Sequence, residues 1–167
     1  MRVIMRPLTR SGQGILGYSE GASLAATFVL EERRRWEEEG RPRRIKVRLF
    51  PIHRGSSRPI LIYFWSFCCL QYAIFFAGWP PVRFCEGAVQ IVLADESEDI
   101  IDVPTCHIVG CNDPYIHGAI ALFSMCDEDT ATMFDHGKGH TVPRNERTIQ
   151  ELVSAIEGTR KKAASAD

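Results

Sequence analysis

The chain has 167 residues, of which 20 are Lys or Arg and 21 are Asp or Glu, so its formal net charge is −1. This length suits one domain that buries its own core, and the charge balance gives no electrostatic reason to expect nucleic acid or an acidic membrane as the main partner. The six cysteines form no CxxC pair and residues 1–14 contain no apolar run typical of a signal peptide, which favours reduced thiols and a cytoplasmic protein.

A short strand followed by a tight turn and a helix is expected near the start of the chain. Residues 1–11 show no periodicity and predict an irregular beginning, after which Ile15-Leu16 ends a short apolar run. From Ser19 apolar residues recur every three or four positions, which indicates a helix, and the charged stretch 31–39 carries this helix into solvent. Gly40 is expected to end it.

The turn between this strand and helix has the pattern Gly-x-Ser-x-Gly, in which Ser19 is the candidate nucleophile. Such a serine lies on a sharp turn at a helix N-terminus, where free N–H groups favour a developing negative charge. By the same geometry the backbone N–H of Glu20 is the first expected oxyanion donor. The pattern alone is short, and a chance glycine-serine turn is its competing interpretation.

Residues 60–78 are almost wholly apolar and allow two interpretations. Their length is close to the about 20 residues that span a bilayer. Their Ile, Phe and Tyr content also suits buried strands, and polar breaks at Ser66 and Gln71 favour that alternative. We expect Tyr72 to Ala77 to form a central strand that ends in a Gly- and Pro-rich loop.

The second half predicts two further strands, each followed by a polar loop. Cys106 to Val109 is short and apolar, as in a buried parallel strand, and the next loop contains Asp113. Residues 119–125 have a helical pattern, and 130–134 form the next expected strand, followed by the glycine-flanked loop with His140. The order serine, acid, histidine is the one found in α/β hydrolases, so Ser19, Asp113 and His140 are the candidate catalytic triad.

Each member of this triad also has a plain structural interpretation. Asp113 precedes a proline and can simply form a turn, and His140 can be a surface loop histidine. Of the other histidines, His107 falls in an apolar strand and suits the core, and His136 is separated from His140 by glycines that argue against a helical metal pair. We assign no function to these or to the remaining two, His53 and His117.

The chain ends with a final amphipathic helix that begins at Asn145 or Thr148 and includes Ile156, and residues 160–167 are predicted to form a polar tail. Alternation of strands, loops and helices predicts a single α/β domain over residues 1–167, with a mostly parallel sheet and helical crossovers. The expected chemistry requires no metal and no organic cofactor. Adjacent Cys68 and Cys69 could bind a metal only with partners brought in by the fold.

Four segments resemble the fungal family of serine hydrolases, an α/β-hydrolase group that includes polyketide-releasing thioesterases and esterases of secondary-metabolite clusters. The segments are LGYSEGASLA (16–25), YAIFFAGWPP (72–81), VPTCHIVGCNDPY (103–115) and GKGHTVPR (137–144). The resemblance implies a triad of Ser19, Asp113 and His140 that acts on an ester or thioester, with an acyl or polyketide chain carried on a synthase as the substrate. Trp79 and Phe84 are expected to line the acyl pocket or to serve packing alone.

Two departures from the family follow from the same comparison. The family has a strand and a His-Gly loop upstream of the elbow, which supplies a second oxyanion N–H, and nothing before Gly14 resembles them. We therefore expect a domain that is incomplete at its N-terminus. Residues 47–71 have no counterpart either, and because Val47 and Gln71 fit codons with intron-boundary dinucleotides, the hypothesis is a retained intron. A catalytically impaired fragment, a non-enzymatic interaction protein and a membrane-anchored protein using residues 60–78 remain the alternatives.

Overall fold

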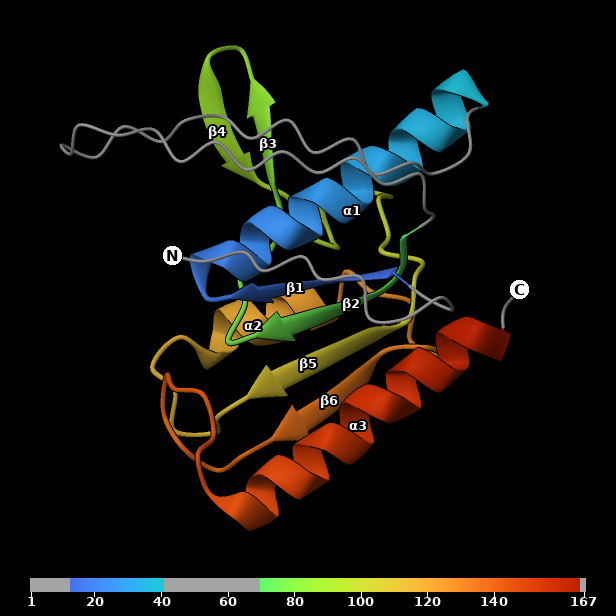
Figure 1. Ribbon diagram of the computed structural model, residues 1–167. Coiled ribbons are helices and arrows are strands. Elements are labelled where there is room, and N and C mark those ends of the chain that lie inside the picture. Colours follow the sequence, from blue (N-terminus) through green and yellow to red (C-terminus); the bar gives the residue numbers. More distant parts are fainter. Residues whose placement is uncertain (1–12, 41–69, 166–167) are drawn as a thin grey trace, which may run out of the picture.

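The computed structural model describes residues 13–40 and 70–165, which form nine helices and strands (Figure 1). In chain order these are β1 (Gln13–Tyr18), α1 (Glu20–Glu39), β2 (Leu70–Phe76), β3 (Val82–Cys85), β4 (Ala88–Ile91), β5 (Thr105–Val109), α2 (Ile116–Phe123), β6 (Thr132–Asp135) and α3 (Glu146–Ser165). The alternation of strands and helices is that of an α/β fold, as expected.

Four strands form one parallel sheet in the order β1-β2-β5-β6. Their arrows point the same way in Figure 1, so their carboxyl ends lie along a single edge. The register places Tyr18 opposite Phe76, and Val109 opposite Asp135, at this edge. Loops that follow parallel strands at this edge are where open α/β sheets place functional groups.

Each face of the sheet is covered by helices, and the alternation of side chains along β2 shows how. Ala73 and Phe75 pack into the core beneath α1 and α2 with Leu122, whereas Tyr72 and Ile74 pack on the other face. There α3 lies alone across the sheet in Figure 1 and contributes buried Leu152. Because β2 is covered on both faces, its sequence is apolar at nearly every position.

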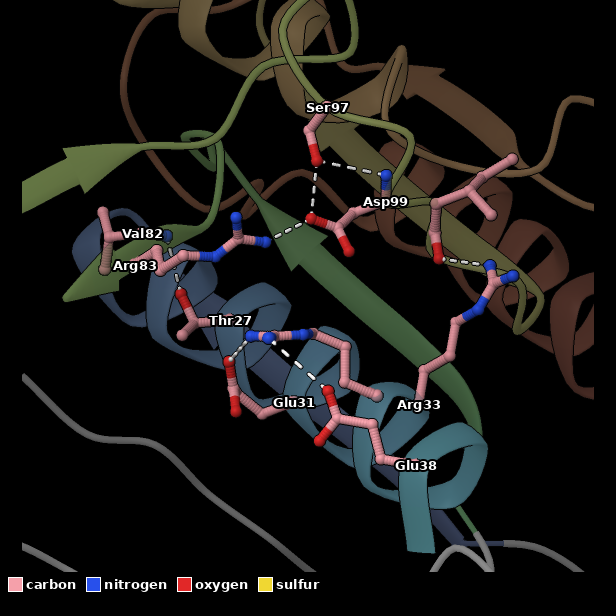
Figure 2. Close-up of polar contacts among 10 residues, drawn as sticks. Thr27, Glu31, Arg33, Glu38, Val82, Arg83, Ser97 and Asp99 are labelled. Carbon is pink, nitrogen blue, oxygen red and sulfur yellow. Dashed lines mark hydrogen bonds and ion pairs between the residues drawn. The ribbon is translucent and has the colours of Figure 1, made fainter. Parts of the chain in front are cut away.

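A two-stranded antiparallel hairpin, β3–β4, rises beside α1 on the side away from the main sheet (Figure 1). Hydrogen bonds connect it to α1 and to the loop after β4. The Val82 N–H donates to the Thr27 hydroxyl over 2.9 Å, and the Arg83 guanidinium pairs with Asp99, which also accepts from Ser97 over 2.6 Å (Figure 2). Burial opposes ionisation of Asp99, but the bonds from Ser97 and Arg83 outweigh it and lower the pKa of its carboxyl.

Charged residues on α1 pair with one another and with the same loop. Arg34 lies between Glu31 and Glu38 on the exposed side of the helix, and Arg33 donates to the Ile100 carbonyl oxygen over 2.8 Å (Figure 2). Exposed pairs of this kind contribute little to stability, about 0.3–0.5 kcal/mol each. The Arg33 contact has the larger structural role, since it joins residues far apart in the sequence.

The boundaries differ from the sequence expectations at several places. The helix after Asp113 begins at Ile116, three residues before the expected Ala119, and the next strand begins at Thr132 instead of Thr130. The last helix continues to Ser165 through the segment expected to be a polar tail, because Ala163 extends the buried stripe that faces β2 and β5. The hairpin β3–β4 was expected to be loop, and it forms because Glu86 and Gly87 adopt a turn with positive φ at both positions.

The apolar run 60–78 is only partly described. Its residues 70–76 are strand β2, in agreement with a buried strand, while residues 60–69 and most of the expected insert 47–71 lie outside the described residues. Leu70 and Gln71, the end of that insert, already belong to β2. No helix in the ranges 13–40 and 70–165 combines the length and the apolar character needed to cross a bilayer.

Candidate active site

Ser19 occupies a strained turn between β1 and α1. Its φ of 53° and ψ of −125° lie where residues other than glycine are rarely found, a conformation that costs about 1–3 kcal/mol. The Ser19 N–H donates to the Phe76 carbonyl oxygen over 2.8 Å, which ties the turn to the end of β2. Gly17 is required just before it, since a Cβ there would lie 2.3 Å from the Gly21 carbonyl oxygen. These contacts are the geometry of a nucleophile elbow.

The structure brings Ser19, Asp113 and His140 together in one hydrogen-bonded chain. His140 Nε2 lies 2.9 Å from the Ser19 hydroxyl oxygen, and His140 Nδ1 lies 2.7 Å from Asp113 Oδ2. The three residues follow β1, β5 and β6, all at the carboxyl edge of the sheet. The distances place a base within reach of the hydroxyl proton and an acid against the second ring nitrogen.

Asp113 is the most buried residue of the hydrogen-bonded triad. Asp113 is 5% exposed, and its second oxygen accepts the Tyr115 N–H over 2.8 Å. That bond and the contact to His140 give both carboxylate oxygens a donor, as a buried carboxylate requires. Asp113 therefore has one fixed orientation, with Oδ2 directed at the imidazole.

Two tyrosines flank the imidazole of His140. The Tyr18 ring lies 5.4 Å from it, centroid to centroid, and the Tyr18 hydroxyl donates to the His140 carbonyl oxygen over 3.2 Å. The Tyr115 ring meets the imidazole edge-on at 5.5 Å. Neither tyrosine was expected at the site from the sequence, where the available signal was their position close to the elbow serine and the triad acid.

The loops that carry Asp113 and His140 are in direct contact. The Asn112 N–H donates to the Lys138 carbonyl oxygen over 3.1 Å, and the Asn112 side-chain amide donates to the Gly137 carbonyl oxygen over 3.2 Å. A Cβ at Gly110 would lie 2.0 Å from the same Lys138 oxygen, so the loops approach as closely as a glycine permits. The acid and the base are thus positioned as one unit.

Glu20 is the first residue of α1, so its backbone N–H has no acceptor within the helix. This N–H follows directly after the nucleophile, as expected for one donor of an oxyanion hole. The helix N-terminus adds a partial positive charge at the same point. The local geometry can therefore stabilise negative charge next to Ser19.

Trp79 and Phe84, the two expected pocket residues, lie in different surroundings. Trp79 follows β2, is 40% exposed, and has its ring 6.2 Å from that of Tyr115. This contact connects Trp79 to His140 through Tyr115. Phe84 lies on the hairpin and is 79% exposed, and no described contact joins it to the triad. The structure therefore leaves Trp79 as the better candidate for contact with a substrate.

Three further possible nucleophiles and bases, His107, Cys106 and Cys126, are buried in the core. Burial lowers the pKa of His107 to about 3, and its ring lies against Phe75 and Phe123 in the core, as expected for a core histidine. Burial raises the pKa of the Cys106 thiol to about 11 and that of Cys126 to about 12, so both are protonated and unreactive at neutral pH.

No cluster of His, Cys, Asp or Glu within the described parts of the chain has the composition and spacing to hold a metal ion. His117 lies inside α2, and His53, Cys68 and Cys69 fall outside the described residues. The hydrogen-bonded triad is therefore the group of described residues to which we assign chemistry.

Comparison with known proteins gives the same family as the sequence motifs. The sequence model of the family described as serine hydrolase (FSH1) matches residues 3–152. This range begins upstream of Gly14, where the resemblance was expected to start, and it extends across residues 47–71. The retained-intron hypothesis is not tested by this match and stays a prediction.

Three relatives come from fungi. The chain is 29% identical over 157 residues to the esterase FPY3 of Fusarium mangiferae, covering 90% of this chain and 57% of the relative. It is 28% identical over 144 residues to the hydrolase phiM of Fungal sp., covering 86% and 56%, and 25% identical over 148 residues to the esterase FUS5 of Gibberella moniliformis, covering 87% and 46%. The chain spans about half the length of these curated relatives.

The family match covers most of the chain, and the elbow at Ser19, the parallel sheet and the hydrogen-bonded triad agree with it. This protein belongs to the serine hydrolase (FSH1) family.

Proposed function

We propose that this protein is a serine esterase or thioesterase that hydrolyses an acyl ester or thioester. The observation that carries the proposal is the chain of contacts from Ser19 through His140 to Asp113, at 2.9 and 2.7 Å. An ordinary surface serine has no such base, and a hydroxyl is a weak nucleophile without one. Family membership and the esterase names of its fungal relatives support the same class of reaction.

The reaction follows from the positions of these groups. The Ser19 hydroxyl oxygen attacks the substrate carbonyl carbon while His140 Nε2 takes the hydroxyl proton, and Asp113 Oδ2 holds Nδ1–H and stabilises the imidazolium. The carbonyl oxygen becomes an oxyanion that the Glu20 N–H faces. His140 then gives its proton to the leaving alcohol or thiol, which forms the acyl-enzyme. A water molecule, deprotonated by His140, releases the acid and restores Ser19.

The finer part of the proposal is the substrate, an acyl or polyketide chain of fungal secondary metabolism, carried on a polyketide synthase. Half-exposed Tyr115 lies beside His140, and half-exposed Trp79 lies beside Tyr115. Aromatic side chains in this position suit a hydrophobic or aromatic part of a substrate. The resemblance to polyketide-releasing enzymes suggests the same substrate class. We place the reaction in the cytoplasm, where thiols such as those of free Cys85 and Cys111 remain reduced.

Labelling with a fluorophosphonate probe tests the catalytic part. The probe reacts with activated serines, so we expect covalent modification of the full chain at Ser19, identified by peptide mass spectrometry. Ser19→Ala should abolish labelling. Ser154→Ala is the matched control, because Ser154 is an exposed serine on α3 whose hydroxyl bonds only to its own helix at the Gln150 carbonyl oxygen, and it should label as the wild type does.

The same preparation tests the substrate class. Hydrolysis of N-acetylcysteamine thioesters of polyketide-like acyl chains, lost in Ser19→Ala, would support the thioesterase proposal. Folded protein that is not labelled at Ser19 would contradict the enzyme proposal and favour the impaired fragment or a non-enzymatic interaction protein. Labelling without thioester hydrolysis, together with hydrolysis of simple oxygen esters, would restrict the function to an esterase. Retention of the protein in a membrane fraction washed with high salt would favour the anchored alternative.

A further inference from the structure

Asp135 is an exposed acidic residue at the end of β6 whose side chain contacts two loops at once. Its Oδ1 accepts the Gly137 N–H over 2.7 Å and the Cys111 N–H over 2.9 Å. The first bond lies within its own loop, and the second crosses to the loop after β5. One oxygen atom therefore joins two segments that lie 24 residues apart in the sequence.

These two segments are the ones that carry the triad acid and base. Cys111 lies two residues before Asp113, and Gly137 lies three residues before His140. Apart from the His140–Asp113 bond of the triad itself, the loops are joined by bonds between neutral groups, such as the two donated by Asn112 to the Lys138 and Gly137 carbonyl oxygens. Asp135 adds an ionised acceptor to this set, and hydrogen bonds to ionised groups are about twice as strong as neutral ones.

The environment of the Asp135 carboxyl favours its ionised form. The bond from the Gly137 N–H is the main cause. Together with the N–H and thiol of Cys111 and the charge of His136, it outweighs desolvation and lowers the pKa of Asp135. At neutral pH the carboxylate therefore holds both loops with its charge intact. It does not touch Ser19, His140 or Asp113 by any contact the structure describes, so its effect on the reaction must be indirect.

We propose that Asp135 is a positioning residue that locks the loop of Asp113 to the loop of His140 and so fixes the hydrogen bond between them. This inference rests on the proposed esterase function. The His140 imidazole must hold one orientation to serve Ser19 on one side and Asp113 on the other. A shift of one loop past the other by about 1 Å would lengthen the 2.7 Å bond between Asp113 and His140, and misplacements of this size lower rates by about 100-fold.

The test compares Asp135→Ala and Asp135→Asn with a matched control in the full chain. Asp127 is a suitable control, because it forms the same kind of turn before β6, where it accepts the Asp129 N–H and the Thr130 hydroxyl, both over 3.1 Å. Asp127→Ala removes similar bonds away from the triad. Three quantities are measured for each protein: the rate of fluorophosphonate labelling, kcat and KM for p-nitrophenyl butyrate, and the thermal unfolding midpoint.

We expect Asp135→Ala to lower the labelling rate and kcat by about 10- to 100-fold with KM little changed. Asp135→Asn should retain part of the rate, because its amide oxygen can still accept both N–H groups without the charge. Asp127→Ala should lower the thermal unfolding midpoint as much as Asp135→Ala does, but leave kcat unchanged. Equal kcat in wild type and Asp135→Ala, or an equal loss in Asp127→Ala, would overturn the positioning role.

Proton NMR separates a failure of this inference from a failure of the proposed function. The His140 Nδ1–H bonded to Asp113 should give a downfield resonance in the wild type and in Asp127→Ala. We expect this resonance to broaden or disappear in Asp135→Ala. If the wild type shows the resonance but is not labelled, the esterase proposal fails and the spectrum of Asp135→Ala still decides the role of Asp135. An unchanged resonance in Asp135→Ala would contradict it.

Discussion

The nucleophile and its two partners are positioned in different ways. Ser19 lies on a turn between a strand and a helix, and main-chain contacts hold it, such as the 2.8 Å bond from its N–H to the Phe76 carbonyl oxygen. Asp113 and His140 lie on loops that are held by hydrogen bonds between loops, including those of Asn112. The elbow is therefore built into the fold, while the acid and base depend on contacts that a single side-chain change can remove.

This difference predicts two kinds of failure. Changes on the acid and base loops should lower the rate of the chemical step while the fold survives. Changes at the elbow should lower the free energy of unfolding together with activity. Two substitutions test this contrast, beyond those already described for Ser19 and Asp135, and a third tests the core.

The largest effect is expected for Asp113→Asn. The amide keeps the shape of the carboxylate but offers N–H groups to His140 Nδ1, which favours the wrong tautomer, so kcat should fall by about 10,000-fold as in other triads of this type. Steady-state kinetics with p-nitrophenyl butyrate and a thermal melt provide the measurement. A loss of less than tenfold would show that Asp113 does not orient the imidazole.

Gly17→Ala should damage the elbow itself. The added Cβ would lie 2.3 Å from the Gly21 carbonyl oxygen and 2.5 Å from the Ala22 Cα, so backbone must move, at a cost of about 1–3 kcal/mol in unfolding free energy. Chemical denaturation measures this change, and labelling of Ser19 should fall with it. Gly158→Ala in α3 is the control, since nothing lies within 4 Å of its Cβ position, and it should stabilise the protein by about 0.5–1 kcal/mol. If Gly17→Ala were labelled as fast as the wild type, the expectation that changes at the elbow lower activity together with stability would be wrong.

The third substitution concerns the buried core, and its effect depends on pH. Burial lowers the pKa of His107 from 6.5 to about 3, so between these values the unfolded chain binds a proton that the folded protein does not. Unfolding free energy should therefore fall as the pH drops from 6.5 towards 3, by about 1.4 kcal/mol per pH unit from this group. In His107→Gln this contribution is absent, so the slope measured by denaturation at pH 4–6.5 should be smaller by that amount. An unchanged slope would show that groups other than His107 cause the loss of stability at low pH.

Much of the site was predictable from sequence because each of its parts has a local signal. The glycines around Ser19 mark a strained turn, and Asp113 and His140 each follow a short apolar or alternating strand. Since parallel strands end at one edge, three such loops are expected to meet there, and the structure places their side chains within hydrogen-bonding distance.

The rest depended on contacts between distant segments that carry no local signal. The Cys111 N–H has no reason in its own sequence to bond to Asp135, and Tyr115 does not mark itself as a neighbour of His140. The β3–β4 hairpin was missed for another reason. Its apolar residues alternate, but they are largely exposed, and Glu86-Gly87 is a weaker turn signal than Asn-Gly.

The strand order of the main sheet has a consequence for how activity appears during folding. Ser19 follows β1 and His140 follows β6, the outermost strands of the sheet that the described residues form. All the pairings are parallel and join distant segments, such as Leu70 with Gln13 and Thr132 with Cys106, and pairings of this kind form late and slowly. Ser19 therefore becomes reactive only once all the strands from β1 to β6 of this sheet have paired. During refolding, recovery of probe labelling would time the completion of the sheet, and a partly assembled chain would carry no reactive serine.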